Sequence, residues 1–148
     1  VTDPFYDETS GVMMMSCSAP VFDGGTFIGV VSIDMTLDVI GDLLEAASFG
    51  DGTGVLLTDA EGEYIYNPNT EADSTSGMSI YNDGSGIDAV ADKILSNESG
   101  TETFYANGSH NCYLYYTTLS NVGWKLAVVV DESVVNKLKL VKLNYQNS

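Results

Sequence analysis

The pattern of hydrophobic and polar positions in the first fifty residues predicts a β-hairpin followed by a helix. Residues 11 to 19 and 26 to 34 are rich in apolar side chains, and the stretch Phe22-Asp23-Gly24-Gly25 between them is typical of a turn. After Thr36, which can cap a helix, apolar residues recur at spacings of three and four. They are Leu37, Ile40, Leu43, Leu44 and Ala47. We expect this helix to end near Gly50.

A second unit follows, and its pattern is that of a complete antiparallel sheet. Short apolar runs at residues 54 to 57 and 64 to 66 flank a polar turn, which predicts another hairpin. A long polar connection, residues 67 to 86, leads to a helix that Ser85 and Asp88 can start as a capping box. Three more strands at residues 101 to 106, 111 to 118 and 124 to 130, and a helix at 132 to 145, complete the unit. The fold class is therefore α+β, with helices on one side of a sheet.

A faint internal repeat relates the two units. The segments "GVVSIDMTLDVI" and "LAVVVDESVVNKL" share a β-branched strand, an aspartate at its end and an amphipathic segment after it. The two aspartates are Asp34 and Asp131, separated by about the length of one small module. The repeat indicates that the chain holds the tail of one module followed by a whole copy of the same module.

The charge balance excludes some classes of partner. The chain has 21 acidic residues against five basic ones, all lysine, and a formal net charge of −16. Such a surface repels phosphate backbones, so we expect no nucleic-acid partner. Three of the lysines, Lys137, Lys139 and Lys142, follow the last acidic residue, Glu132. A basic end of this kind fits a segment that approaches a membrane surface, or a solvated helix face.

The residues that usually carry metal or catalytic chemistry are sparse. Cys17 and Cys112 have neither the number of a disulfide framework nor a CxxC spacing, and we interpret both as core residues. The single histidine, His110, follows the turn residues Asn107-Gly108 and is expected on a hairpin surface. We therefore expect no metal site and no cofactor. The chain also lacks a catalytic triad pattern, a phosphate loop and a zinc-protease motif, which argues against an enzyme.

Four segments together resemble a known family. They are "PFYDETSG", "SAPVFDGGTFIGVVSIDMTL", "LLTDAEGEYIYNP" and "NVGWKLAVVV", and they resemble the double Cache sensor domains of bacterial membrane receptors. The resemblance implies two PAS-like antiparallel sheets with flanking helices, outside the cytoplasm and anchored to the cell membrane. Residues 1 to 47 would be the C-terminal part of the membrane-distal module, and residues 48 to 148 the membrane-proximal module. The resemblance implies a cytoplasmic partner that is a chemotaxis transducer, histidine kinase or diguanylate cyclase, and any catalysis would lie in that cytoplasmic output domain.

The resemblance also implies a ligand site. In double Cache sensors that bind amino acids, the aspartate that closes the "GVV..D" strand holds the ligand's ammonium group, and an upstream aspartate assists it. Those positions are Asp34 and Asp7 here. Phe5 occupies the neighbouring aromatic position, where the family usually has tyrosine. Strand alternation places Ser32 on the same face as Asp34. The implied partner is a small solute, an amino acid or an amine, and the receptor could be a homodimer.

Asp34 has two interpretations from its sequence position. A carboxylate taken out of water costs several kcal/mol unless it is paired, so a buried Asp34 would suit a cationic ligand. Alternatively, Asp34 marks the strand end and caps the helix that begins near Thr36. If it only caps, the domain could be a structural or protein-docking module without a ligand.

Overall fold

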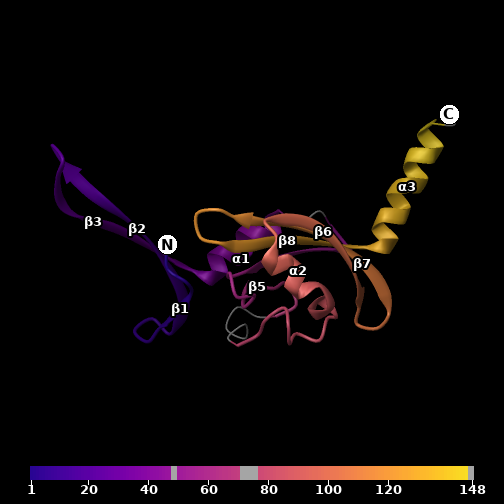
Figure 1. Ribbon diagram of the computed structural model, residues 1–148, viewed down its shortest axis with the longest axis horizontal. Coiled ribbons are helices and arrows are strands. Elements are labelled where there is room, and N and C mark those ends of the chain that lie inside the picture. Colours follow the sequence, from indigo (N-terminus) through magenta and orange to yellow (C-terminus); the bar gives the residue numbers. More distant parts are fainter. Residues whose placement is uncertain (48–49, 71–76, 147–148) are drawn as a thin grey trace.

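The computed structural model describes residues 1–47, 50–70 and 77–146, with only the backbone described at 143–145. Within these residues the strands form two antiparallel sheets (Figure 1). The N-terminal sheet contains β1 (Phe5–Asp7), β2 (Val12–Asp23) and β3 (Thr26–Thr36), in that spatial order. The C-terminal sheet has the order β5-β4-β8-β7-β6.

The five strands of the C-terminal sheet come from the second unit of the sequence. They are β4 (Thr53–Thr58), β5 (Tyr64–Tyr66), β6 (Ser99–Ala106), β7 (His110–Leu119) and β8 (Trp124–Asp131). The chain between β5 and β6 contains the 3₁₀-helix η2 (Ile87–Val90) and the helix α2 (Ala91–Ser96). Every pairing in this sheet is antiparallel, and β8 lies at its centre between β4 and β7.

The C-terminal sheet is apolar on both faces because each face carries its own core. On one face, η2 and α2 pack over the strands through Ile87, Val90 and Ile94, and the buried sheet residues there include Leu114. On the other face, the cluster consists of Met15, Leu37, Leu57, Ile65 and Trp124. Met15 belongs to β2 and Leu37 to α1 (Leu37–Ala46), so the base of the N-terminal sheet and α1 cover this second face.

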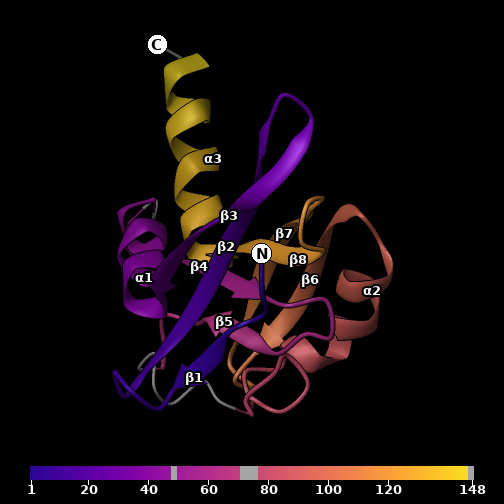
Figure 2. The same cartoon turned by 90° about the vertical axis from the view of Figure 1, so that its left-hand side faces the viewer.

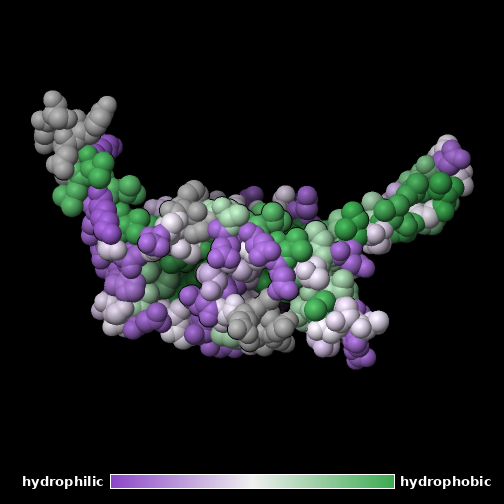
Figure 3. Space-filling model, turned by 180° about the vertical axis from the view of Figure 1, so that it is seen from behind, coloured by the Kyte–Doolittle hydropathy of each residue, from purple (hydrophilic) through white to green (hydrophobic). Residues whose placement is uncertain are grey.

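Two arms extend from this body. The β2–β3 hairpin leaves it on one side, and α3 (Glu132–Gln146) on the other (Figure 1). Seen from the hairpin side, both arms project above the body (Figure 2). Apolar side chains are exposed along both arms (Figure 3). On the hairpin they include Ile28, Val30, Val31 and Ile33, and on α3 they are Leu138, Leu140 and Val141. No helix in the described ranges combines the length and apolarity needed to cross a membrane.

The predicted elements are present, with differences at their ends. Strand β3 continues past Asp34 to Thr36, because β2 still pairs with it there through Met14. Thr36 is the N-cap of α1 but makes no side-chain capping bond. The capping box expected at Ser85 is replaced by a turn with Gly86 as N-cap at φ 92°, although Ser85 Oγ still accepts a bond from the Ile87 N–H at 3.3 Å. Part of the polar connection, residues 71–76, lies outside the described residues.

Candidate functional site

The four candidate site residues from the sequence, three from the family resemblance and Ser32 from strand alternation, lie on one face of the N-terminal sheet. Directly paired residues of antiparallel strands share a face. Phe5 pairs with Met14, which pairs with Thr36, and the next pairs on this face are Ser16 with Asp34 and Ser18 with Ser32. Asp7, two positions after Phe5 and paired with Val12, is on the same face. The register therefore places Phe5, Asp7, Ser32 and Asp34 on one face of the sheet, here called the hairpin patch.

Asp34 makes its contact within the sheet. Its Oδ1 accepts a hydrogen bond from Ser16 Oγ at 2.5 Å, and Ser18 and Ser32 hydroxyls meet at 2.8 Å in the next row. The expectation that Asp34 is buried is wrong for the described chain, because its side chain is exposed. The capping alternative is not supported either, since Asp34 lies inside β3 and α1 begins three residues later at Leu37.

Asp7 and Phe5 lie at the other end of the hairpin patch. Asp7 Oδ2 accepts bonds from Ser10 Oγ at 2.5 Å and Ser10 N at 2.8 Å, and these bonds hold the pKa of Asp7 below its ordinary value. Phe5 is 40% exposed. Along β2, the partners of Asp7 and Asp34 are Val12 and Ser16, four residues or about 13 Å apart. The structure therefore groups Asp34 with Ser32 and does not bring Asp7 close to it.

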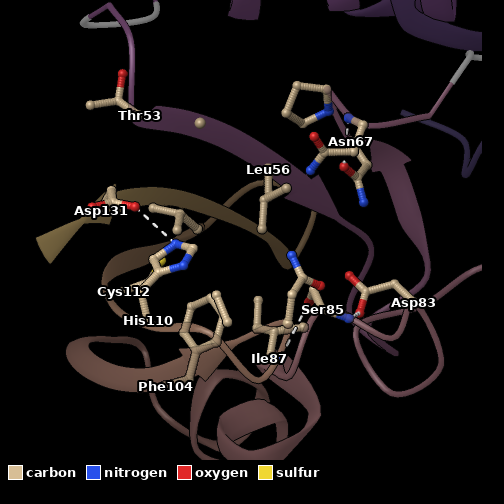
Figure 4. Close-up of a pocket in the computed structure, with 17 residues that line it drawn as sticks. Thr53, Leu56, Asn67, Asp83, Ser85, Ile87, Phe104, His110, Cys112 and Asp131 are labelled. Atoms are coloured by element: carbon tan, nitrogen blue, oxygen red, sulfur yellow. Dashed lines mark hydrogen bonds and ion pairs between the residues drawn. The ribbon is translucent and has the colours of Figure 1, made fainter. Parts of the chain in front are cut away.

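A second candidate site is a cavity of about 350 Å³ on the helix-covered side of the C-terminal sheet (Figure 4). Leu56, Ile87 and Phe104 form apolar walls between two polar ends. At one end, Asp83 accepts a hydrogen bond from the Tyr64 hydroxyl at 2.5 Å. Burial, and then the bond to Asp83, raise the pKa of Tyr64 well above its ordinary value. The cavity is thus an apolar chamber with carboxylates at its ends, since Asp131 lies at the other end (Figure 4).

The Asp131 end brings together a histidine, a cysteine and a carboxylate. His110 Nε2 lies 2.8 Å from Asp131 Oδ2, and one ligand atom each from His110, Cys112 and Asp131 fit within 4.8 Å of one another. Cys112 is 5% exposed, and burial, followed by the nearby Asp131 charge, raises the pKa of its thiol. Hydrogen bonding to Ser133 lowers the pKa of Asp131. We call these three residues the His–Cys–Asp cluster.

Sequence reasoning missed this cluster although it placed each member correctly. His110 is at the surface end of β7, Cys112 is in the core, and Asp131 ends β8. His110 and Cys112 are two residues apart on one strand and so share a face. Cys112 pairs directly with Asp131. The first relation can be read from the sequence, but the second depends on the register between β7 and β8, which the sequence alone does not give.

Comparison with known proteins identifies relatives over most of the chain. The Cache domain family matches residues 1–137. The methyl-accepting chemotaxis protein McpC of Bacillus subtilis is 25% identical over 130 residues, which are 88% of this chain and 18% of that protein.

Among solved structures, the ligand-binding domain of the Pseudomonas aeruginosa PAO1 amino acid chemoreceptor PctB, in complex with L-Arg, has a TM-score of 0.65 at 20% identity. The match covers 98% of this chain and 54% of that one. The ligand-binding domain of the Pseudomonas fluorescens chemoreceptor CtaA, in complex with L-alanine, has a TM-score of 0.59 at 21% identity, covering 88% of this chain and 53% of that one. The chain therefore spans about half the length of these solved chains.

Proposed function

Because the chain belongs to the Cache domain family of extracellular sensor domains, we propose that it detects a small amino acid or amine through the hairpin patch. The observation that carries the proposal is the sheet register, which places Asp34, Ser32, Phe5 and Asp7 on one face. A carboxylate beside hydroxyl groups suits an ammonium group, which donates charge-assisted hydrogen bonds. Amino acids bound to PctB and CtaA favour the same ligand class for this relative.

The arrangement of the hairpin patch suggests which residue would contact which group of the ligand. Asp34 and Ser32 would hold the ammonium group, with Ser16 fixing the Asp34 carboxylate at 2.5 Å. Phe5 lies one row away on the same face and offers an aromatic surface to the ligand's carbon chain. Asp7 lies about 13 Å from Asp34 along β2. It would contact a different part of the ligand or contribute its negative charge to the electrostatic potential of the patch.

We further propose that residues 1–47 are part of a membrane-distal module and that residues 48–148 form the membrane-proximal one. The hairpin supports this division because it is apolar on both sides, with Val30, Val31 and Ile33 each more than half exposed. Monomeric soluble proteins rarely expose contiguous apolar surface of this kind. In a module of the length seen in the solved relatives, further strands would cover the hairpin and enclose Asp34.

In the receptor that contains it, this domain would transmit a ligand-dependent conformational change and would not itself catalyse a reaction. Helix α3 directly follows β8, which ends at Asp131. The exposed α3 residues Leu138 and Val141 could pack against a second copy of the chain in a homodimer. A ligand changes the output only if it binds the two arrangements of the receptor with different affinity. Any enzymatic output, such as a histidine kinase or diguanylate cyclase, would lie in a separate cytoplasmic domain.

Calorimetry with a panel of amino acids and amines on the intact extracellular domain tests the proposal. We expect one ligand class to bind, and Asp34→Asn to weaken that binding at least about 100-fold, because it removes the charge but keeps the shape. Asp23→Asn is the matched control, since Asp23 lies at the far end of the same hairpin. Equal binding by wild type and Asp34→Asn would reject the assignment of Asp34. Absence of any binding from the panel would favour the docking-module alternative.

A further inference from the structure

We propose that the His–Cys–Asp cluster of the C-terminal sheet is a binding site for a transition-metal ion, with Zn²⁺ as the best match. This site is separate from the hairpin patch and does not depend on its function. Nitrogen, thiolate and carboxylate are the three ligand types that Zn²⁺ takes in proteins. His110, Cys112 and Asp131 supply one of each, and the atoms lie within 4.8 Å of one another.

The spacing of the three atoms is close to that of a tetrahedral site. Zinc bonds of about 2.0–2.3 Å place neighbouring ligand atoms roughly 3.3–3.8 Å apart. His110 Nε2 and Asp131 Oδ2, at 2.8 Å, would move apart slightly to admit the ion. Small side-chain rotations would make this room, because the β7–β8 pairing holds Cys112 and Asp131 opposite each other. The strand pairing therefore brings two of the three ligands together before the ion binds.

The hydrogen bonds around the cluster direct the correct atoms toward the metal position. Ser109 Oγ lies 2.6 Å from His110 Nδ1 and also donates to the Ala106 carbonyl at 3.1 Å. The contact with Ser109 occupies Nδ1, so Nε2 is the ring nitrogen that remains to face Asp131, and it lies 2.8 Å from Asp131 Oδ2. In metal sites, such a second bond at histidine fixes the ring and its tautomer.

Asp131 is oriented in the same way. Its Oδ1 accepts a bond from the Ser133 N–H at 2.6 Å in the first turn of α3, which leaves Oδ2 as the oxygen that faces His110. The fourth tetrahedral position would open toward the 350 Å³ cavity, where water or a solute could occupy it. A bound ion would therefore join β7 and β8 at the residue that caps α3, the element that leaves the body of the domain.

Metal binding to the chelator-treated, reduced chain tests the site. We expect one Zn²⁺ per chain by competition with a chromophoric chelator. Co²⁺ in its place should give a thiolate-to-cobalt charge-transfer band. Loss of a residue that orients a metal ligand typically costs 10–100-fold in metal affinity, so Ser109→Ala should weaken Zn²⁺ binding by about this amount. Cys112→Ser, His110→Gln and Asp131→Asn remove ligands and should each cost at least about 100-fold.

Two matched variants separate the site from adventitious binding. Cys17→Ser removes the other cysteine, which is exposed on β2, and Asp83→Asn removes the carboxylate at the opposite end of the cavity. Both should bind Zn²⁺ as wild type does, with the cobalt band intact. Asp131→Asn keeps a side chain able to cap α3, so circular dichroism should show a folded chain. Zinc affinity that is unchanged in Cys112→Ser, or a cobalt spectrum without thiolate character, would overturn the proposal and leave a simple His110–Asp131 ion pair.

Discussion

At the scale of single residues, the same side chain type has different roles according to what it contacts. Asp34 is exposed and bonded to one serine, Asp7 stabilises a turn through Ser10, and Asp131 faces a histidine while capping a helix. Asp34 and Asp131 both lie near the end of a β-branched strand, as the internal repeat predicts. Their neighbours differ, because Ser16 lies opposite Asp34, whereas Cys112 lies opposite Asp131. Strand position alone therefore does not determine the chemistry.

Tyr64 provides a prediction on pH. Its hydroxyl donates to Asp83 in a buried setting, which raises its pKa in the folded chain. An unfolded tyrosine titrates near pH 10, so above this pH the unfolded chain loses the proton first. The contribution of Tyr64 to the free energy of unfolding should therefore be constant below about pH 10 and fall as the pH rises beyond it.

Denaturant unfolding between about pH 8 and pH 11 checks this. Tyr64→Phe should show a shallower decline above pH 10, because it removes the hydroxyl whose pKa is raised. The variant also removes the bond to Asp83 Oδ2, while the Ser85 N–H still donates to Asp83 Oδ1. Tyr105→Phe, which changes a tyrosine that is 56% exposed, is the control and should decline as wild type does. If Tyr64→Phe and wild type decline equally, the Tyr64 proton does not contribute.

At the scale of elements, the sequence predicts the strands and helices well but not how they pack together. Alternation and turn residues predicted the hairpin of residues 11 to 34 and the five strands that follow. The short strand β1 has three residues, too few to show a pattern. Nor can the run Met13-Met14-Met15 indicate which face meets the core, since both faces are apolar. Tertiary contacts decide which face of β2 is buried. Met15 packs in one cluster with Leu57, about forty positions later, and with Trp124, over a hundred positions later.

The packing of the β2–β3 hairpin against the C-terminal sheet can be tested by substituting Met15. Met15 is 3% exposed, whereas Cys17, two positions later on the same face of β2, is exposed, so the expectation that Cys17 is a core residue is wrong. Met15→Ala should lower the free energy of unfolding by about 2–5 kcal/mol through lost burial and a cavity. Cys17→Ala should change it by less than about 0.5 kcal/mol. Amide exchange should also accelerate at the base of β2 in Met15→Ala. Equal effects of the two variants would show that the hairpin is not held by this contact.

At the scale of the whole molecule, charge and shape are distributed unevenly. The acidic residues belong mostly to the body and hairpin, while Lys137, Lys139 and Lys142 lie on the projecting α3. The net charge of −16 could be predicted from composition, and so could its consequence that phosphate-rich partners are repelled. The His–Cys–Asp cluster could not, because it depends on the pairing of two strands whose register is decided by the packing of the entire sheet.

The same net charge should make the stability of the fold depend on salt. Few described ion pairs offset the repulsion among carboxylates: Lys93 with Glu102 and His110 with Asp131. Raising the ionic strength from about 0.01 M to 0.15 M shortens the screening length from about 30 Å to about 8 Å. This should stabilise the compact state by on the order of 1 kcal/mol, a rise in Tm of about 2–4 °C for a domain of this size. Sodium chloride and tetramethylammonium chloride should act alike, because screening depends on ionic strength and not on the identity of the cation. A rise with sodium alone would indicate a bound ion, and a falling Tm would show that favourable pairs outweigh the repulsion.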